Sequence, residues 1–445
     1  MRRKVAVTAA VALALSLSAV AGCGGSSRGG SGVTATGTEV RATDVARADP
    51  GSVSTTALVD GITAFGHDLY ANVAAKAASG NIVISPLSIA VAMSMARAGA
   101  GGSTASEIDA ALHFPESARD AAMNALTRDL ATRDTAPPID SPPSPAPSAS
   151  ADIAGGWTPK PPILTIANGL FVQQGQQIGA PFLHTIAADY GSGVRTVDFG
   201  SASATQQINA WVHKQTAGRI DKLFDSLSPA TRLVLANAVY LKADWATPFM
   251  AGATKDAAFT RADGSTVRTP TMHETTSLGY ADGGGWQAVE IPYAGDTLAM
   301  WVILPSGSTP LAELLTPPTL LAIRNGLKPS AVNLSLPRWD FATNVELKPA
   351  LQQLGVHAAF TSAADFAGIS RSLYISAAIH RANITVDEWG TEAAAVTGLA
   401  FAAGAIMPQV TLKVDHPFAF AIVHKQTGAV VFEGSVADPS ASNAQ

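Results

Sequence analysis

The stretch GTEAAAVTG, Gly390–Gly398, decides how the whole chain is interpreted. One glycine is followed by small or medium uncharged residues and a single charge, Glu392. In a strand, alternate side chains share a face. One face would carry Thr391, Ala393, Ala395 and Thr397, and the other would carry Glu392, Ala394 and Val396. Every residue of the first face is small, so this stretch can enter a sheet without burying its charge.

Composition indicates one large folded unit. The 445 residues are 47% hydrophobic and 14% charged, as expected of one continuous core. The net charge is −5, and no run of Lys or Arg forms the basic stripe that nucleic acid requires, so we expect no nucleic-acid partner.

Helical spacing occurs early in the chain and strand patterns occur late. The helical segments are 55–76, 85–100, 103–112 and 205–218. The strand segments are 232–245, 298–305, 332–339, 418–425 and 429–436, the last two forming a hairpin. This order predicts an α+β fold with large, mainly antiparallel sheets.

The N-terminus has the pattern of an export signal. MRRK is followed by the apolar run VAVTAAVALALSLSAVAG, so residues 1–22 are interpreted as a lipoprotein signal peptide. VAGC, Val20–Cys23, resembles the lipobox of bacterial lipoproteins, and Cys23 is the only cysteine. The alternative is an ordinary signal peptide that happens to contain a cysteine. We expect Cys23 to be lipidated and the protein to be exported and anchored at the outer face of the bacterial cell membrane.

Low-complexity segments set the expected boundaries. Residues 23–53 are interpreted as a lipidated Gly/Ser-rich tether, and the folded domain is expected at 54–439 with a tail at 440–445. Residues 135–162 are too rich in proline for a helix or a central strand, which predicts an exposed inserted loop.

Two motifs of common enzymes are missing from the sequence. Ser-x-x-Lys does not occur, and His273–Ser277 has serine where a His-Glu-x-x-His zinc motif needs its second histidine. We therefore expect no catalytic residues, no metal and no cofactor, and we expect that the protein is not an enzyme.

Four segments together resemble the serpin family. They are NIVISPLSIAVAMSMARAGAGGSTASEIDAAL, LVLANAVYLKADWATPF, ITVDEWGTEAAAVTG and DHPFAFAIVHKQTGAVVFEGSV, in the family's order. The resemblance implies a five-stranded central sheet A, sheets B and C, about nine helices and an exposed reactive-centre loop at 390–412. A buried alanine-rich helix at Gly390–Gly398 would leave these flanking motifs unexplained. A membrane helix needs about 20 residues, more than Ala393–Met407 supplies.

The resemblance also assigns residues to three regions that take part in loop insertion. The shutter, a polar cluster beneath sheet A, is expected to contain Ser85, Ser88, Asn237 and His380. The breach, where the loop first enters, is expected to contain Trp245 and an ion pair between Arg338 and Glu388. The hinge is expected to contain Glu388, Gly390, Thr391, Glu392, Ala393, Ala394, Ala395, Val396 and Thr397. Trp389 stands where the family usually has a small or charged residue.

The implied function is suicide inhibition of serine proteases, with papain-like cysteine proteases as further targets. The loop is cut, inserts into sheet A and traps the acyl-enzyme. The cut residue, P1, is expected within Gly404, Ala405, Ile406 and Met407. Because this segment has no Arg or Lys, elastase-like, subtilisin-like or chymotrypsin-like proteases are favoured over trypsin-like ones. The resemblance further implies a monomer.

Two other functions stay open from the sequence. A non-inhibitory serpin acting as a surface binding protein would tolerate large or charged inward residues in the hinge, which this chain lacks. A surface hydrolase or solute-binding lipoprotein would need a pocket with convergent polar groups.

Overall fold

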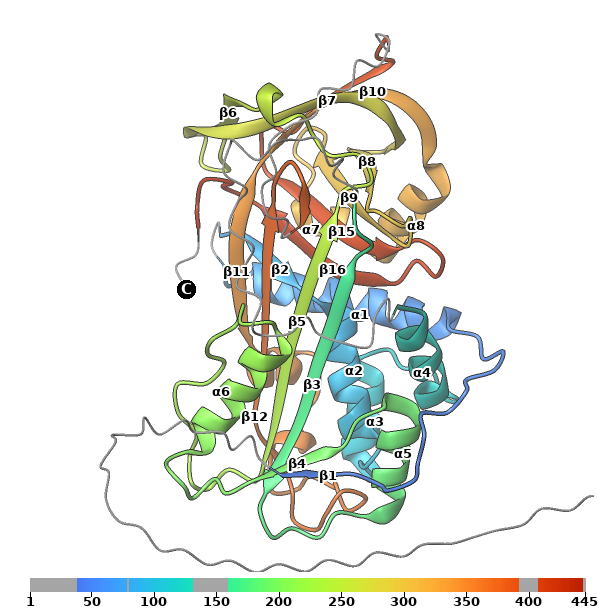
Figure 1. The fold of residues 1–445 in the computed structure, drawn as a ribbon, viewed down its shortest axis with the longest axis vertical. Helices are drawn as coiled ribbons and strands as arrows, with labels where there is room; N and C mark the ends of the chain where they lie inside the picture. Colours follow the sequence, from blue (N-terminus) through green and yellow to red (C-terminus); the bar gives the residue numbers. More distant parts are fainter. Residues whose placement is uncertain (1–37, 78–79, 131–158, 392–406, 443–445) are drawn as a thin grey trace, which may run out of the picture. The chain divides into compact units, whose positions relative to one another are not determined.

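The computed structural model describes residues 38–77, 80–130, 159–391 and 407–442 (Figure 1). Within these residues there are nine α-helices: α1 Thr56–Ala74, α2 Pro86–Arg97, α3 Gly102–Ala111, α4 Arg119–Leu130, α5 Ala180–Tyr190, α6 Ala204–Gln215, α7 Leu311–Leu314, α8 Pro317–Gly326 and α9 Leu347–Gln353. Two short 3₁₀ helices are η1 Ala251–Ala253 and η2 Ala358–Phe360. In the described part of the chain, no helix is both long and apolar enough to cross a membrane.

Seven strands form the first sheet, which we call sheet A. In spatial order they are β1 Thr38–Val40, β4 Val194–Val197, β3 Ile163–Gln173, β5 Leu233–Asp244, β13 Gly390–Thr391, β12 Ile375–Val386 and β11 Trp339–Glu346. The five strands expected for sheet A are present. The two extra strands are short: β1 extends one edge and β13 lies between β5 and β12.

The remaining strands form one nine-stranded sheet. They are β2 Ile82–Ile84, β6 Lys255–Thr260, β7 Thr266–Gly283, β8 Trp286–Pro292, β9 Leu298–Pro305, β10 Lys328–Pro337, β14 Val410–Lys413, β15 Phe418–His424 and β16 Val430–Val436. The expected sheets B and C are joined in one hydrogen-bonded sheet because β7, 18 residues long, pairs with β6 and β10 and also with β8. The hairpin predicted at the C-terminus is β15–β16.

The central strand β5 of sheet A is buried on both faces, which explains its nearly continuous apolar sequence. Leu233 and Leu235 belong to the main core, which includes residues of α1, α2 and the second sheet. Val234 and Ala236 pack in a smaller core together with Trp211 of α6. Figure 1 shows α6 and α2 on opposite sides of β3 and β5.

The predicted start of the folded domain at residue 54 is wrong. Thr38–Val40 pairs antiparallel with β4, and Arg195 forms an ion pair with Glu39 at 2.8 Å. Farther along, the Arg47 Nε donates to Asn124 Oδ1 at 2.9 Å. Strand pairing, an ion pair and a hydrogen bond to residues far along the chain hold the segment before residue 54 in place. Its composition gives no sign of these contacts.

Candidate functional site

The hinge begins in a tight turn between β12 and β13. Asp387 Oδ1 accepts hydrogen bonds from the backbone N–H groups of Trp389 at 2.8 Å and Gly390 at 3.3 Å. The Asp387 N–H donates to the Gly390 carbonyl at 3.1 Å. A side chain that accepts from the backbone two residues later stabilises a turn of this kind. The turn reverses the chain, so that β13 runs antiparallel beside β12.

Gly390 is required by its neighbours as well as by its conformation. Its φ is +155°, and a Cβ built at this position would lie 2.0 Å from the Ala243 carbonyl oxygen on β5. A side chain there would push the hinge away from β5. The absence of a side chain at Gly390 therefore permits the close approach of two strands.

Thr391 is already a member of sheet A. It pairs with Ala243 of β5 and with Val386 of β12, and it is 2% exposed. Its Oγ1 lies 2.6 Å from the hydroxyl of Tyr293, which is fully buried. The inward orientation predicted for Thr391 is confirmed.

Below Thr391, β5 and β12 pair directly. Their parallel register extends from Leu233↔Ile375 to Val239↔Ala382. We call this boundary between β5 and β12 the seam. The seam is thus occupied by Gly390 and Thr391 at its upper end and is closed by direct pairing from Val239 and Ala382 downward.

The breach surrounds the start of the hinge with aromatic and polar groups. Trp245 is fully buried, and its Nε1 donates to the Asp387 carbonyl at 2.9 Å. Its ring stacks on Tyr293 at 4.6 Å with an interplanar angle of 10°. The predicted ion pair between Arg338 and Glu388 is confirmed, and Glu388 also accepts from Thr254 Oγ1.

Backbone hydrogen bonds hold the same segment to the connection after β5. Trp245 N donates to the Trp389 carbonyl, and Phe249 N donates to the Glu388 carbonyl, each at 2.8 Å. Trp389, the unusual residue before the hinge glycine, is buried at 6% exposure. Burial raises the pKa of the Asp387 carboxyl to about 6, with neighbouring Glu388 acting in the same direction.

The four predicted shutter residues lie together beneath sheet A, each fully buried. Asn237 and His380 face each other across the seam as a pair of the parallel register, and Asn237 Oδ1 is hydrogen-bonded to His380 Nδ1. Asn237 Nδ2 donates to the Ser88 carbonyl at 2.8 Å and lies 2.6 Å from Ser88 Oγ. Ser85 Oγ accepts from Ser88 N at the start of α2 and donates to the Val431 carbonyl at 2.6 Å.

His380 is neutral in this network. Its Nε2 accepts from Ser85 N at 3.1 Å, so its proton is on Nδ1, which donates to Asn237. Burial lowers the pKa of His380 to about 3. A neutral network can exchange hydrogen-bond partners without separating charges.

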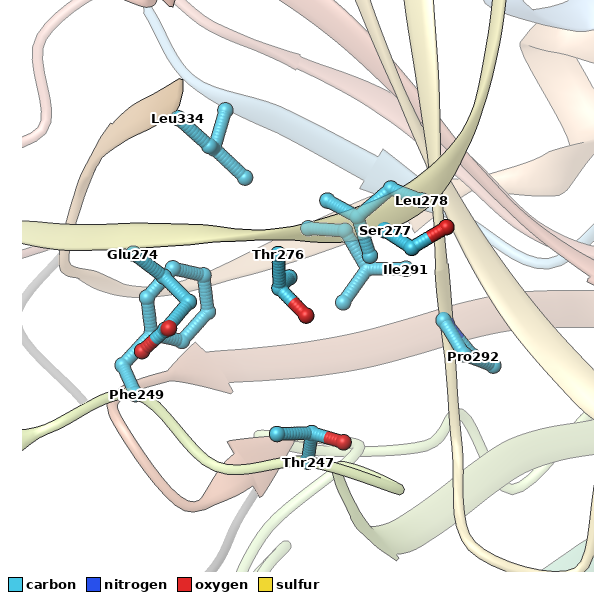
Figure 2. Close-up of a pocket in the computed structure, with 9 residues that line it drawn as sticks. All are labelled: Thr247, Phe249, Glu274, Thr276, Ser277, Leu278, Ile291, Pro292 and Leu334. Atoms are coloured by element: carbon cyan, nitrogen blue, oxygen red, sulfur yellow. The ribbon is translucent and has the colours of Figure 1, made fainter. Parts of the chain in front are cut away.

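A small cavity lies beside the breach (Figure 2). Its volume is about 50 Å³, and it is lined by Thr247, Phe249, Glu274, Thr276, Ser277, Leu278, Ile291, Pro292 and Leu334. Burial raises the pKa of the Glu274 carboxyl, which Figure 2 shows beside the Phe249 ring. The volume suits one or two water molecules and is far below that of a small-molecule site.

Several predicted residues lie outside the described part of the chain. These are Cys23, the hinge residues from Glu392 to Thr397, and Gly404, Ala405 and Ile406. Met407, the last residue of the predicted P1 window, is described and is 83% exposed. Of the proline-rich segment 135–162, residues 135–158 also lie outside the described part of the chain. No group of three or more potential metal ligands occurs among the described residues.

Sequence reasoning missed three residues of this site. Asn168 of β3 pairs with Asn237 and is hydrogen-bonded to it through Oδ1. Tyr293 and Thr254 contact the hinge and Glu388. An asparagine within the apolar run IANGLFV was the one local signal available for Asn168.

Comparison with known proteins agrees with this geometry. The family model described as Serpin (serine protease inhibitor) matches residues 60–439. An uncharacterized serpin-like protein of Thermococcus kodakarensis is 35% identical over 393 residues, covering 86% of each chain. The leukocyte elastase inhibitor of Sus scrofa is 34% identical over 394 residues, covering 85% of this chain and 98% of the relative.

Solved structures show the same fold. The native state of tengpin, a thermophilic serpin, matches with a TM-score of 0.76 and 25% identity, covering 90% of this chain and 99% of tengpin. Serpins are generally protease inhibitors and not catalytic enzymes. With a family model matching most of its length and the serpin architecture in its sheets and helices, the chain belongs to the serpin family.

Proposed function

We propose that this serpin is an exported suicide inhibitor of serine proteases whose cleaved loop inserts into sheet A. The observation that carries the proposal is the state of the seam. Thr391 already occupies its upper end, and the two strands below are held by parallel pairing that an incoming strand can replace with antiparallel pairing on both sides.

The register of Thr391 defines where the rest of the loop would go. Continuing it down the seam places Ala393 and Ala395 at the next inward positions, where small side chains fit a closed core. Thr397 would then stand opposite both Asn237 and His380. Its hydroxyl could bond to these two groups after their own hydrogen bond across the seam is broken.

The residues near the predicted cleavage site indicate the class of target. No Arg or Lys occurs between Leu399 and Gln409, and Met407 is largely exposed. We therefore favour proteases that accept small or medium apolar residues, namely elastase-like, subtilisin-like or chymotrypsin-like enzymes. Papain-like cysteine proteases are the second class.

The direct test is incubation with an elastase, a subtilisin, a chymotrypsin, a papain and a trypsin, followed by a denaturing gel. We expect a covalent complex with at least one of the first four and none with trypsin. Cleavage within Ala403–Met407 should also raise the melting temperature, because insertion completes sheet A. Cleavage without any complex, and without a rise in melting temperature, would identify a non-inhibitory serpin.

We further propose that the protein is anchored through a lipid on Cys23. The support is the VAGC motif in a chain with no other cysteine. Because β1 begins at Thr38, the tether would be residues 24–37, at most about 50 Å when fully extended. The test compares membrane partition of wild type and Cys23→Ala, and equal partition would contradict the anchor.

A further inference from the structure

The hydroxyl of Tyr293 is positioned where it can fix the first residue of the inserting strand. Tyr293 follows β8, is fully buried, and donates its backbone N–H to the Leu298 carbonyl at 3.0 Å. Its ring is stacked on Trp245, which is itself fully buried. The hydroxyl that meets Thr391 is therefore held by a rigid support.

Thr391 needs this partner. With 2% exposure, its Oγ1 has almost no access to water, and the Tyr293 hydroxyl lies 2.6 Å away. Burial raises the pKa of Tyr293, so the phenol is neutral and can donate its proton or accept one. Losing either hydroxyl would leave the other buried without its hydrogen bond.

The register of a strand is set where it begins. A slip by one residue would exchange the two faces of the hinge and direct Glu392 into the core. Gly390 and Thr391 pair with Asp244 and Ala243 of β5, and there is no room beside Ala243 for a residue larger than Gly390. The side-chain bond to Tyr293 adds a contact that is specific to Thr391.

We propose that Tyr293 is a positioning residue for loop insertion. Its hydroxyl holds Thr391 at the first inserted position in the intact protein, so that insertion continues an existing register and does not begin with a search for one. This inference rests on the proposed inhibitory function. It assigns Tyr293 no role in recognising or cutting the loop.

The test uses variants that change one hydroxyl at a time. Tyr293→Phe keeps the ring and its stacking, Thr391→Val keeps the size of the side chain, and Thr391→Ser keeps the hydroxyl. Two quantities are measured with an elastase that wild type inhibits: the rate of loop cleavage and the number of inhibitor molecules consumed for each protease trapped. Hydrogen exchange of the peptide containing residues 387–391 reports whether the hinge is engaged before cleavage.

We expect Tyr293→Phe and Thr391→Val each to slow insertion about three- to tenfold, as expected for one buried hydrogen bond. The number of inhibitor molecules consumed should rise while the cleavage rate is unchanged. Residues 387–391 should exchange faster, the double variant should be no worse than either single variant, and Thr391→Ser should resemble wild type.

Three results would overturn the inference: unchanged consumption and exchange in Tyr293→Phe, additive effects in the double variant, or a Thr391→Ser variant as impaired as Thr391→Val. Melting curves identify a variant that fails to fold, and Thr391→Val then supplies the same test with Tyr293 intact. If wild type traps no protease, the proposed function fails. Hydrogen exchange still decides whether Tyr293 holds the hinge.

Discussion

The shutter and the breach secure the same two strands by different means. At the shutter, neutral side chains bridge β5 and β12 through the bond between Asn237 and His380. At the breach, aromatic stacking and backbone hydrogen bonds surround a hinge that already lies between the strands. The difference indicates where opening starts. The upper end needs no new separation of strands, whereas insertion beyond Val239 and Ala382 must exchange one set of bonds for another.

The largest expected effect is at the breach, in Thr391→Arg. Thr391 is buried against Tyr293, so an arginine there would bury a cation without a partner or force the hinge out of sheet A. Either outcome adds several kcal/mol to the insertion barrier, and each 1.4 kcal/mol slows insertion about tenfold. We expect insertion to be slowed at least about a hundredfold, and the variant should be cut as a substrate.

The matched control for Thr391→Arg is Glu392→Arg. Once the loop is inserted as a strand, alternation from Thr391 would direct the side chain of residue 392 outward, so this variant should retain most of its inhibition. Covalent complexes are counted on a denaturing gel at a fixed protease concentration. Thr391→Arg trapping protease as well as wild type does would contradict insertion at this register.

The next effect is expected at the shutter, in Asn237→Ala. This change removes the hydrogen bonds to the Ser88 carbonyl and to His380, leaving both buried groups short of a partner. We expect a loss of about 2–3 kcal/mol in the free energy of unfolding of the intact form. Asn168→Ala is the control, because it removes only the bond that Asn168 Oδ1 accepts from Asn237 and leaves the bonds from Asn237 to His380 and to the Ser88 carbonyl in place. An equal loss in both variants would show that packing, and not the bond across the seam, stabilises the shutter.

The two regions should also respond to pH in opposite directions. Burial raises the pKa of Asp387 from 3.8 to about 6, so the folded state holds its proton more tightly and the contribution of Asp387 to stability falls as pH rises from about 4 to 6. Burial lowers the pKa of His380 from 6.5 to about 3, so the folded state resists its protonation. The contribution of His380 therefore rises as pH rises through the same window.

Asp387 and His380 each change the free energy of unfolding by at most about 1.4 kcal/mol per pH unit. The two changes oppose each other in wild type. The free energy of unfolding is measured by denaturant titration from pH 4 to 7. Asp387→Asn should make stability rise more steeply with pH than in wild type, and His380→Gln should make it fall. Parallel profiles for wild type and both variants would show that neither group titrates as its burial requires.

The shutter was predictable from sequence, and the immediate environment of the hinge was not. Ser85, Ser88, Asn237 and His380 each stand in a motif whose order matches the serpin family, so their convergence followed from the fold. Tyr293 meets Thr391 across 98 residues, and Asn168 meets Asn237 across 69 residues, with no local pattern that marks either contact. The order of residues 38–53 likewise depends on distant partners such as Asn124, so composition alone gave the wrong boundary.

The smallest expected effect concerns the ion pair of the breach, between Arg338 and Glu388. Glu388 is 2% exposed, but the side chain of Arg338 is 43% exposed, and Glu388 keeps a second partner in Thr254. A pair with one solvated member contributes about 0–1 kcal/mol and is screened by salt. Arg338→Met should therefore lower the free energy of unfolding by less than Asn237→Ala does. The difference between Arg338→Met and wild type should shrink as NaCl is raised from 0.05 to 1 M. A loss above about 2 kcal/mol in the free energy of unfolding that is independent of salt would mean that Arg338 compensates a fully buried charge. The ion pair would then stabilise the top of the seam more strongly than the shutter stabilises its middle.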